Sequence, residues 1–283
     1  MRLGLSTPVV VQVPGVASPW EADAGPDELR TVAAAADALG YEFLTCSEHV
    51  AIPAEDAAIR GDVYWDPLST LGFLAAHTHR IKLATAVLVL GYHHPLEIAK
   101  RYGTLDRLSG GRLILGVGIG SLTEEFDAIG ADWKQRAARA DDALRALRAS
   151  LSVPTPEYRG PFYSYGGMSV QPHATSDPVP IWVGGRSMQS LRRAVTFGDG
   201  WLPFALRAAE VAEMLAAVEI PDGFDVVLST GPLDPATEAA AVRRRLRSLR
   251  DAGATAVSCT VTARSAEHYT EQLHLLRELA DAT

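Results

Sequence analysis

The sequence is poor in lysine and in cysteine. Only three of its 26 basic residues are lysine, namely Lys82, Lys100 and Lys134. An enzyme that works through a catalytic lysine is therefore disfavoured. Cys46 and Cys259 are the two cysteines and both lie in apolar, strand-like runs, and no Cys/His cluster has the spacing of metal ligands. We expect two buried free thiols, no disulfide and no metal.

A long hydrophobic run is also missing. The longest, residues 81–90, contains Lys82 and is far shorter than the roughly 18 to 20 residues that cross a bilayer. The N-terminal segment has one positive charge and a short β-branched run, which is typical of a first strand rather than of an export signal. The net charge of −8 disfavours a general affinity for nucleic acid or for an anionic membrane. We expect a cytoplasmic protein with neither kind of partner.

Strand-like and helix-like patterns alternate along the 283 residues. The strand-like segments are residues 3–11, 43–47, 81–90, 113–117, 181–183, 201–204, 226–229 and 256–261. The helix-like segments that follow them are residues 27–39, 67–77, 95–108, 134–151, 188–197, 209–218, 237–251 and 267–280. Eight such units predict a parallel sheet closed into a (β/α)8 barrel, a fold of about 250 residues. An open, doubly wound sheet is the alternative, but neither a nucleotide fingerprint nor a mid-chain linker marks two halves.

Residues 152–180 interrupt this alternation between the fourth and fifth strands. The segment is rich in proline and aromatic residues and contains the pair Gly166-Gly167, which is typical of an irregular excursion. Long ordered excursions usually cover functional sites. We therefore expect one domain, residues 1–283, with an insertion at about 152–180.

The fourth strand ends in alternating glycines, within the sequence GRLILGVGIGSLTEEF of residues 111–126. Gly116, Gly118 and Gly120 allow a large group to approach the backbone where the strand ends, and a bulky anionic or planar ligand is the natural candidate. The dinucleotide fingerprint requires a third glycine where Ser121 and Thr123 stand. This segment is therefore not that fingerprint.

Other strand ends carry polar groups, and functional residues of a (β/α)8 barrel lie at this face. Glu48 and His49 follow the second strand, and a carboxylate beside an imidazole can bind a polar ring edge and move a proton near neutral pH. The alternative, without a functional role, is that Glu48 caps the loop and His49 is solvated. After the third strand, His93 can reach into the barrel mouth, whereas His94 precedes Pro95 and is more typical of a solvated helix start.

The fifth strand ends in a second glycine turn. Gly184, Gly185, Arg186 and Ser187 precede a helix, so backbone N–H groups, a guanidinium and a hydroxyl could together bind an anion such as phosphate. A plain tight turn is the alternative. The Gly198-Asp199-Gly200-Trp201 segment lies at the opposite end of this topology, so we expect it to form a turn that seats the tryptophan.

Taken together, these segments resemble the bacterial luciferase-like monooxygenase family, in particular the branch that uses the deazaflavin coenzyme F420. The similarity runs over most of the chain. It includes the Glu48-His49 pair, HPLEIAKRYGTLDRLSGGRLILGVGIG at 94–120, EEFDAIG at 124–130 and PIWVGGRSMQSLRRAVTFGDGW at 180–201. The resemblance implies a TIM barrel with an excursion between strands four and five, and often a non-prolyl cis peptide in strand three. Here that peptide would be Thr85-Ala86 or Ala86-Val87.

The resemblance also implies site residues. Gly118, Ile119, Gly120 and Ser121, together with residues 184–187, would line the ribityl and phosphate portions of the cofactor, and Thr85 and Ala86 would lie at its ring. His49 would face the reactive carbon as a proton donor or substrate orienter, and Glu48 would fix the ring edge.

Family members that oxidise sugar phosphates carry an acid just after the strand-four glycines and use lysines for the substrate phosphate. This chain has Ser121 at that point and few lysines, so glucose 6-phosphate is a poor substrate candidate.

The leading hypothesis is an F420-dependent oxidoreductase that transfers a hydride to or from a small organic molecule, and the family suggests a homodimer through the helices after strands two and three. A reduced-FMN monooxygenase is the alternative within redox chemistry. A non-redox phosphate-binding barrel enzyme and a non-catalytic cofactor-binding protein are the remaining hypotheses.

Overall fold

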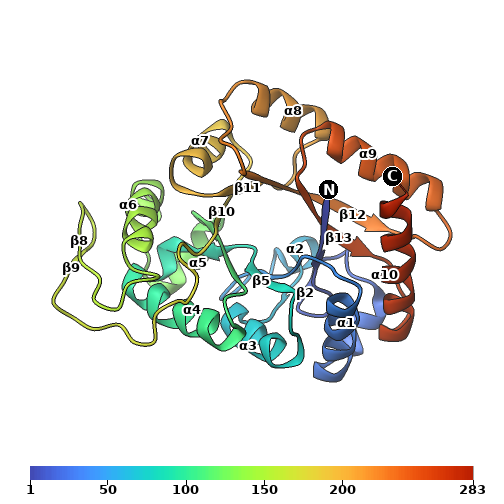
Figure 1. Ribbon diagram of the computed structural model, residues 1–283, viewed down its shortest axis with the longest axis horizontal. Helices are drawn as coiled ribbons and strands as arrows, with labels where there is room; N and C mark the ends of the chain where they lie inside the picture. Colours follow the sequence, from blue (N-terminus) through green and yellow to red (C-terminus); the bar gives the residue numbers. More distant parts are fainter. Residues whose placement is uncertain (283) are drawn as a thin grey trace.

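Eight parallel strands close into a barrel in the computed structural model, which describes residues 1–282 (Figure 1). The barrel strands are β1 (Arg2–Ser6), β3 (Phe43–Cys46), β5 (Lys82–Thr85), β7 (Leu113–Gly118), β10 (Ile181–Gly184), β11 (Gly200–Leu202), β12 (Asp225–Leu233) and β13 (Ala256–Val261). Each strand pairs in parallel with the next, and β1 pairs with both β3 and β13. The predicted TIM barrel is confirmed, and an open sheet is excluded because no barrel strand is an edge.

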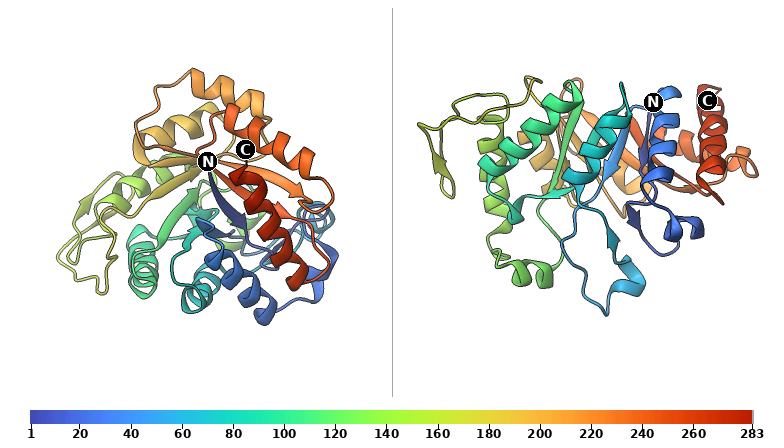
Figure 2. Two further views of the ribbon diagram at one scale, coloured as in Figure 1. Left: turned by 45° about the vertical axis from the view of Figure 1, so that its right-hand side comes forward. Right: turned by 90° about the horizontal axis from the view of Figure 1, so that it is seen from below.

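A ring of helices surrounds this barrel (Figures 1 and 2). They are α1 (Pro26–Ala38), α3 (Pro67–His77), α4 (Pro95–Ser109), α6 (Arg136–Arg148), α7 (Met188–Phe197), α8 (Ala208–Ala216), α9 (Ala239–Asp251) and α10 (Ala266–Asp281). Proline begins α1, α3 and α4, where its missing N–H costs nothing, and Gly110 ends α4 with a φ of 72°. No helix among residues 1–282 is long and apolar enough to cross a membrane.

The barrel interior is filled by side chains that interlock between opposite strands. The rings of Phe43 and Trp182 meet edge to face with centroids 5.1 Å apart, and both residues are fully buried. A Cβ on Gly4 would lie 2.3 Å from the Phe43 ring, so glycine in β1 makes room for it. Both Cys46 and Cys259 are buried free thiols, as predicted, and burial raises the pKa of each to about 12.

Two predicted strands are shorter than expected. The first ends at Ser6 rather than residue 11, because the chain turns at Val9 (φ 75°) and continues as β2 (Val11–Gln12), which pairs with β4 (Val63–Tyr64). The third breaks after Thr85 and resumes as the short β6 (Leu88–Val89), which pairs with β7 and leads into the 3-10 turn η2 (Leu90–Tyr92). The remaining short elements are η1 (Pro19–Asp23), α2 (Ala57–Arg60) and α5 (Thr123–Ile129).

The excursion of residues 152–180 packs on the outer side of α4 and α6 and carries the hairpin of β8 (Tyr158–Arg159) and β9 (Ser164–Tyr165) (Figure 1). Two buried carboxylates anchor it. Asp106 of α4 accepts hydrogen bonds from the backbone and hydroxyl groups of Thr175 and Ser176, and Asp142 of α6 accepts from the Tyr158 hydroxyl. These anchors hold the excursion against α4 and α6, and the rings of Tyr163 and Tyr165 reach His94 at the start of α4.

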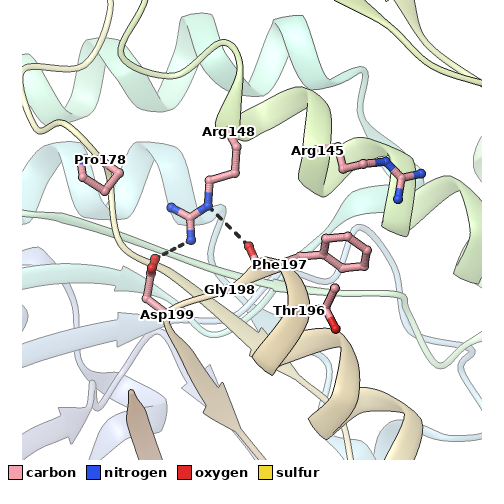
Figure 3. Close-up of a pocket in the computed structure, with 7 residues that line it drawn as sticks. All are labelled: Arg145, Arg148, Pro178, Thr196, Phe197, Gly198 and Asp199. Carbon is pink, nitrogen blue, oxygen red and sulfur yellow. Dashed lines mark hydrogen bonds and ion pairs between the residues drawn. The ribbon is translucent and has the colours of Figure 1, made fainter. Parts of the chain in front are cut away.

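A hollow of about 500 Å³ lies between the C-terminal ends of α6 and α7, at the end of the barrel where the strands begin (Figure 3). Charged side chains of this hollow hydrogen-bond to the backbone of neighbouring elements. Arg148 donates to the carbonyls of Val179 and Phe197 and pairs with Asp199, which also accepts from the Ile181 amide at 2.7 Å. Asp199 therefore builds the turn before β11, as its place in the sequence predicts.

Candidate active site

A non-prolyl cis peptide joins Ala86 and Val87 at the C-terminal end of β5. This is one of the two peptides that the family resemblance implies. The loop after β3 holds the segment in place. The Ser47 hydroxyl donates to the Ala86 carbonyl at 2.7 Å, and the Glu48 amide donates to the Val87 carbonyl at 3.3 Å. The chain between β5 and β6 is therefore fixed to the residue that precedes His49.

The glycines of β7 and β10 make room for this same segment. A Cβ on Gly116 would lie 1.9 Å from the Thr85 carbonyl oxygen. A Cβ on Gly118 would lie 2.6 Å from one methyl of Val87, and a Cβ on Gly184 would lie 2.9 Å from the other. The glycine pattern predicts a close approach by a ligand. At these glycines, however, the approaching atoms belong to the protein.

The Val87 side chain is wedged between the ends of β7 and β10 and remains partly exposed. Ala86 is likewise half-buried. Thr85, in contrast, is fully buried, and its hydroxyl donates to the Gly116 carbonyl at 2.6 Å. Ala86 and Val87 therefore present a small apolar surface at the barrel mouth, while Thr85 only supports it.

Glu48 pairs with His93 rather than with its sequence neighbour. Its Oε1 lies 2.7 Å from Nε2 of His93, and its Oε2 accepts from the Val89 amide at 2.6 Å. Glu48 is 8% exposed, so both oxygens are used within the protein. Glu48 thus joins the loop after β3 to β6 and to the turn before α4. Glu48 and His49 are adjacent in the sequence, but their side chains have different partners.

His49 pairs with Glu125 of α5, which begins just after the glycines of β7. The Nδ1 atom of His49 lies 2.9 Å from Oε2 of Glu125. The other oxygen, Oε1, accepts from the backbone amides of Val50 and Ala51. The loop after β3 and α5 lie at the same end of the barrel in the right-hand view of Figure 2. The pair leaves Nε2 of a half-buried imidazole available for proton transfer.

Glu125 is held as a carboxylate. Burial of its side chain, which is 1% exposed, favours the neutral acid. The hydrogen bonds from His49 and the Val50 amide, with the nearby Tyr92 hydroxyl, outweigh burial and hold the pKa of Glu125 below its usual value. An anion therefore faces His49 at neutral pH.

Aromatic side chains flank the pair. Tyr64 meets the His49 ring edge to face at 4.6 Å, and Tyr92 meets Phe126 at 4.9 Å. The Tyr92 hydroxyl is buried and has no partner in good hydrogen-bonding geometry among residues 1–282. Burial and the charge of Glu125 raise the pKa of Tyr92. Tyr64 therefore lies against His49, and Tyr92 lies near Glu125.

The four residues of the turn after β10 differ in their contacts and exposure. Gly184 is buried beside Val87, and Gly185, with a φ of 129°, packs on Ser190. Ser187 caps α7 by accepting from the Ser190 amide at 3.2 Å. Arg186 is exposed, and its guanidinium lies 5.7 Å from the Phe204 ring. Arg186 is the cation of this turn that remains open to an anion.

The remaining predicted residues lie at the end of β7. Ile119 and Gly120 are half-buried and Ser121 is exposed. A Cβ on Gly120, whose φ is 82°, would lie 2.4 Å from the Phe126 ring. His94 accepts from the Leu96 amide at 3.1 Å as the N-cap of α4, in agreement with its predicted place at a helix start.

Sequence reasoning assigned no role to Glu125, although it lies in a segment that carries the family resemblance. One signal was present, because the residue stands in the first turn of a helix directly after a barrel strand. No group of three or more histidine, cysteine, aspartate or glutamate side chains among residues 1–282 is arranged to hold a metal ion.

The fold and this site define a (β/α)8-barrel protein with a histidine–carboxylate pair and an exposed arginine at its strand ends. The sequence model for luciferase-like monooxygenases matches residues 1–282, and the chain belongs to this family.

The chain is also similar to proteins from several organisms. An uncharacterized protein of Mycobacterium tuberculosis is 29% identical over 200 residues, which are 66% of this chain and 69% of the relative. An F420-dependent glucose-6-phosphate dehydrogenase of Nakamurella multipartita is 28% identical over 205 residues, 71% of this chain and 59% of the relative.

Among solved structures, the monooxygenase RslO1 of Streptomyces bottropensis has a TM-score of 0.76 at 20% identity, with all of both chains covered. The F420-dependent tetrahydromethanopterin reductase of Methanopyrus kandleri has a TM-score of 0.71 at 17% identity, covering 90% of this chain and 95% of the reductase. These two similarities concern the fold.

Proposed function

We propose that this protein is an F420-dependent oxidoreductase that transfers a hydride between the deazaflavin and a small organic substrate. The observation that carries the proposal is the His49 imidazole, which is oriented by a carboxylate and directly follows Ser47 and Glu48, the residues that hold the Ala86-Val87 segment at the strand ends. The choice of cofactor rests on the glucose-6-phosphate dehydrogenases among the relatives, whose names specify F420.

The residues present suit a flavin-type cofactor. The partly exposed Val87 and Ala86 supply an apolar surface for a planar ring. The exposed Arg186, next to the capped start of α7, supplies positive charge suited to a phosphate. The net charge of −8 gives an anionic ligand no general attraction, so this local cation carries the electrostatic part of binding.

The chain's own residues then have distinct roles. His49 exchanges a proton with the substrate at Nε2, and Glu48 keeps the β5–β6 segment and His93 in place. We propose that Ile119, Gly120 and Ser121 line the cofactor on the β7 side and that residues 185–187 line it on the β10 side, while Gly118 and Gly184 take part by making room for Val87. F420 supplies the hydride acceptor or donor when bound, and the protein positions the reactants.

The substrate is proposed to differ from glucose 6-phosphate. Ser121 is exposed at the end of β7, where an acid would be expected for a sugar-phosphate dehydrogenase of this family. The aromatic rings of Tyr64, against His49, and of Tyr92, against His93, favour a substrate with an apolar portion.

A reduced-FMN monooxygenase is the competing proposal, because FMN shares the ring, ribityl chain and phosphate of F420. Binding separates the two. Oxidised and reduced F420 and FMN are titrated into the purified protein, and the change in cofactor fluorescence or absorbance is followed. We expect saturable binding of F420 and none of FMN. Preference for FMN would favour the monooxygenase, and binding of neither cofactor would contradict both proposals.

We also propose that the protein is a homodimer through α3 and α4. Leu108 lies near the end of α4 with 73% of its surface exposed, as an apolar residue at an interface would be in the isolated chain. Light scattering gives the mass directly, and a Leu108→Asp variant is expected to shift the protein toward the monomer mass. Leu275→Asp on α10, where the leucine is 37% exposed, is the matched control. A wild-type mass of one chain would contradict the proposal.

A further inference from the structure

The orientation of His49 depends on one residue of a distant segment. Its Nδ1 atom contacts Oε2 of Glu125, and the Tyr64 ring covers one side of the imidazole with an interplanar angle of 71°. The carboxylate thus meets the ring at Nδ1, and Nε2 lies on the other edge of the imidazole. The two ring nitrogens therefore have different surroundings.

The Glu125 side chain cannot rotate away from His49 without losing further hydrogen bonds. Its Oε1 accepts from the amides of Val50 and Ala51, the two residues that follow His49. One carboxylate therefore binds both the imidazole and the backbone of the loop that carries it. Since the side chain is 1% exposed, water does not replace these contacts.

The chemistry of the donors fixes the protonation pattern. A carboxylate only accepts hydrogen bonds, so the Nδ1 atom that faces it carries the proton. In a neutral imidazole the Nε2 atom is then the acceptor, and it is the atom that can take a proton from a substrate or return it. The titratable groups around Glu125 are His49, Tyr64 and Tyr92, and Glu125 alone among these groups is an anion facing Nδ1 of His49.

We infer that Glu125 is a positioning residue that holds His49 with Nδ1 protonated and leaves Nε2 as the proton-transferring atom. The inference rests on the proposed function only for the reaction that His49 serves. The tautomer itself is a property of the protein without cofactor.

A glutamine at position 125 reverses this pattern. Its carbonyl oxygen is needed by the Val50 and Ala51 amides, so its NH2 group faces Nδ1 of His49. A donor facing Nδ1 requires that atom to be the acceptor, which moves the proton to Nε2. The comparable aspartate-to-asparagine exchange in the serine-protease triad keeps the geometry, imposes the wrong tautomer and lowers turnover by about 10⁴-fold.

The test is to measure the tautomer of His49 in protein labelled with ¹⁵N-histidine and free of cofactor, at a pH where the imidazole is neutral. Long-range ¹H–¹⁵N spectra distinguish the two nitrogens, and the loss of signals in His49→Ala assigns the residue. We expect the Nδ1–H form in the wild type, the Nε2–H form in Glu125→Gln and the wild-type form in Glu124→Gln. Glu124 is the exposed neighbour on α5 and provides the matched control.

Two results would overturn the inference: a wild-type His49 in the Nε2–H form, or a Glu125→Gln variant with an unchanged tautomer. The first needs no variant, so a folding defect in Glu125→Gln does not protect the inference. In the F420-loaded enzyme, Glu125→Gln is expected to lower kcat by about 100-fold or more and to change the Kd for F420 by less than about threefold. A tautomer reversal in a protein that binds no F420 would reject the proposed function and leave this inference standing.

Discussion

Nδ1 of His49 and Oε2 of Glu125 lie 2.9 Å apart, although 76 positions separate the two residues in the sequence. The barrel brings them together because one follows β3 and the other follows β7, and all strands end at the same face. The adjacent Glu48 has a different partner, His93. Two carboxylate–imidazole pairs therefore stand at the barrel mouth, and each joins two segments that are distant in sequence.

Removal of the His49 imidazole is expected to lower turnover without weakening the binding of F420. We expect His49→Ala to lower turnover of the F420-loaded enzyme by about 100-fold or more, since positioned proton transfer contributes about 10² to 10⁴. The affinity for F420 should stay within about threefold, because the apolar surface and Arg186 remain. Fluorescence titration and steady-state kinetics measure the two quantities. A collapse of affinity with unchanged turnover at saturation would show that His49 binds rather than catalyses.

Arg186 is expected to bind the phosphate group of the cofactor. Arg186→Gln should weaken F420 binding by about tenfold, which corresponds to the roughly 1.4 kcal/mol of one charge-assisted contact. The difference should shrink as salt is raised, since the guanidinium is exposed. Arg207→Gln is the control, because it removes the same charge from a side chain that is 83% exposed and paired with Glu210. Equal affinities for Arg186→Gln and the control would remove Arg186 from the site.

Alanine substitutions at Gly116 and at Gly72 are expected to change the free energy of unfolding in opposite directions. A Cβ on Gly116 would meet the Thr85 carbonyl oxygen at 1.9 Å, so Gly116→Ala should lower the free energy of unfolding by about 3 kcal/mol or more. Gly72 lies within α3, where an added Cβ would have no neighbour within 4 Å, so Gly72→Ala should raise it by about 0.5 to 1 kcal/mol. Urea denaturation measures both. A Gly116→Ala variant as stable as the wild type would contradict the close approach of β7 to the end of β5.

Asp37 links the stability of the fold to pH. Its buried carboxylate accepts from the amides of His79, Arg80 and Ile81 at 2.7, 2.9 and 2.7 Å. Burial favours the neutral acid, but these hydrogen bonds outweigh burial and lower the pKa of Asp37. A lowered pKa means that the stabilisation is complete above the pKa of the unfolded chain, near 3.8, and is lost as the pH falls through the lower folded value.

Asp37→Asn should therefore lower the free energy of unfolding by about 2 kcal/mol at pH 7, because its NH2 group faces backbone donors. The difference from the wild type should decrease as the pH falls from about 5 to about 2. Asp222→Asn, at an exposed loop position, should match the wild type across this range. A difference that stays constant with pH would mean that the carboxylate charge does not contribute.

The fold could be predicted from the sequence where local signals and burial agree. Residues 67–77 and 188–197 are predicted as helices and coincide with α3 and α7, whose N-terminal ends carry Pro67 and the cap Ser187. The third strand could not be delimited, because Leu88 and Val89 continue the apolar run of β5 beyond the break at Ala86-Val87. Hydrophobicity in the sequence indicates which residues are buried. Because Leu88 and Val89 beyond the break are buried like the residues of β5, hydrophobicity does not mark where the strand ends.

The site was harder to predict than the fold. The glycines show that something approaches the backbone, but they do not show whether it is a ligand or Val87. Glu48 and His49 are adjacent in the sequence, but side chains of adjacent residues in an extended segment point in different directions, and here they have different partners. The pairing with Glu125 arises from barrel closure, which no local pattern contains.

The central claim is that F420 binds at the strand ends, over Val87 and beside His49. A crystal structure of the protein with F420 tests it most directly. We predict the deazaflavin ring against Ala86 and Val87, its reactive face toward His49 and its phosphate at Arg186. A ring bound elsewhere, such as in the hollow beside Arg145 and Phe197 (Figure 3), would contradict the claim, as would a ring at the strand ends turned away from His49.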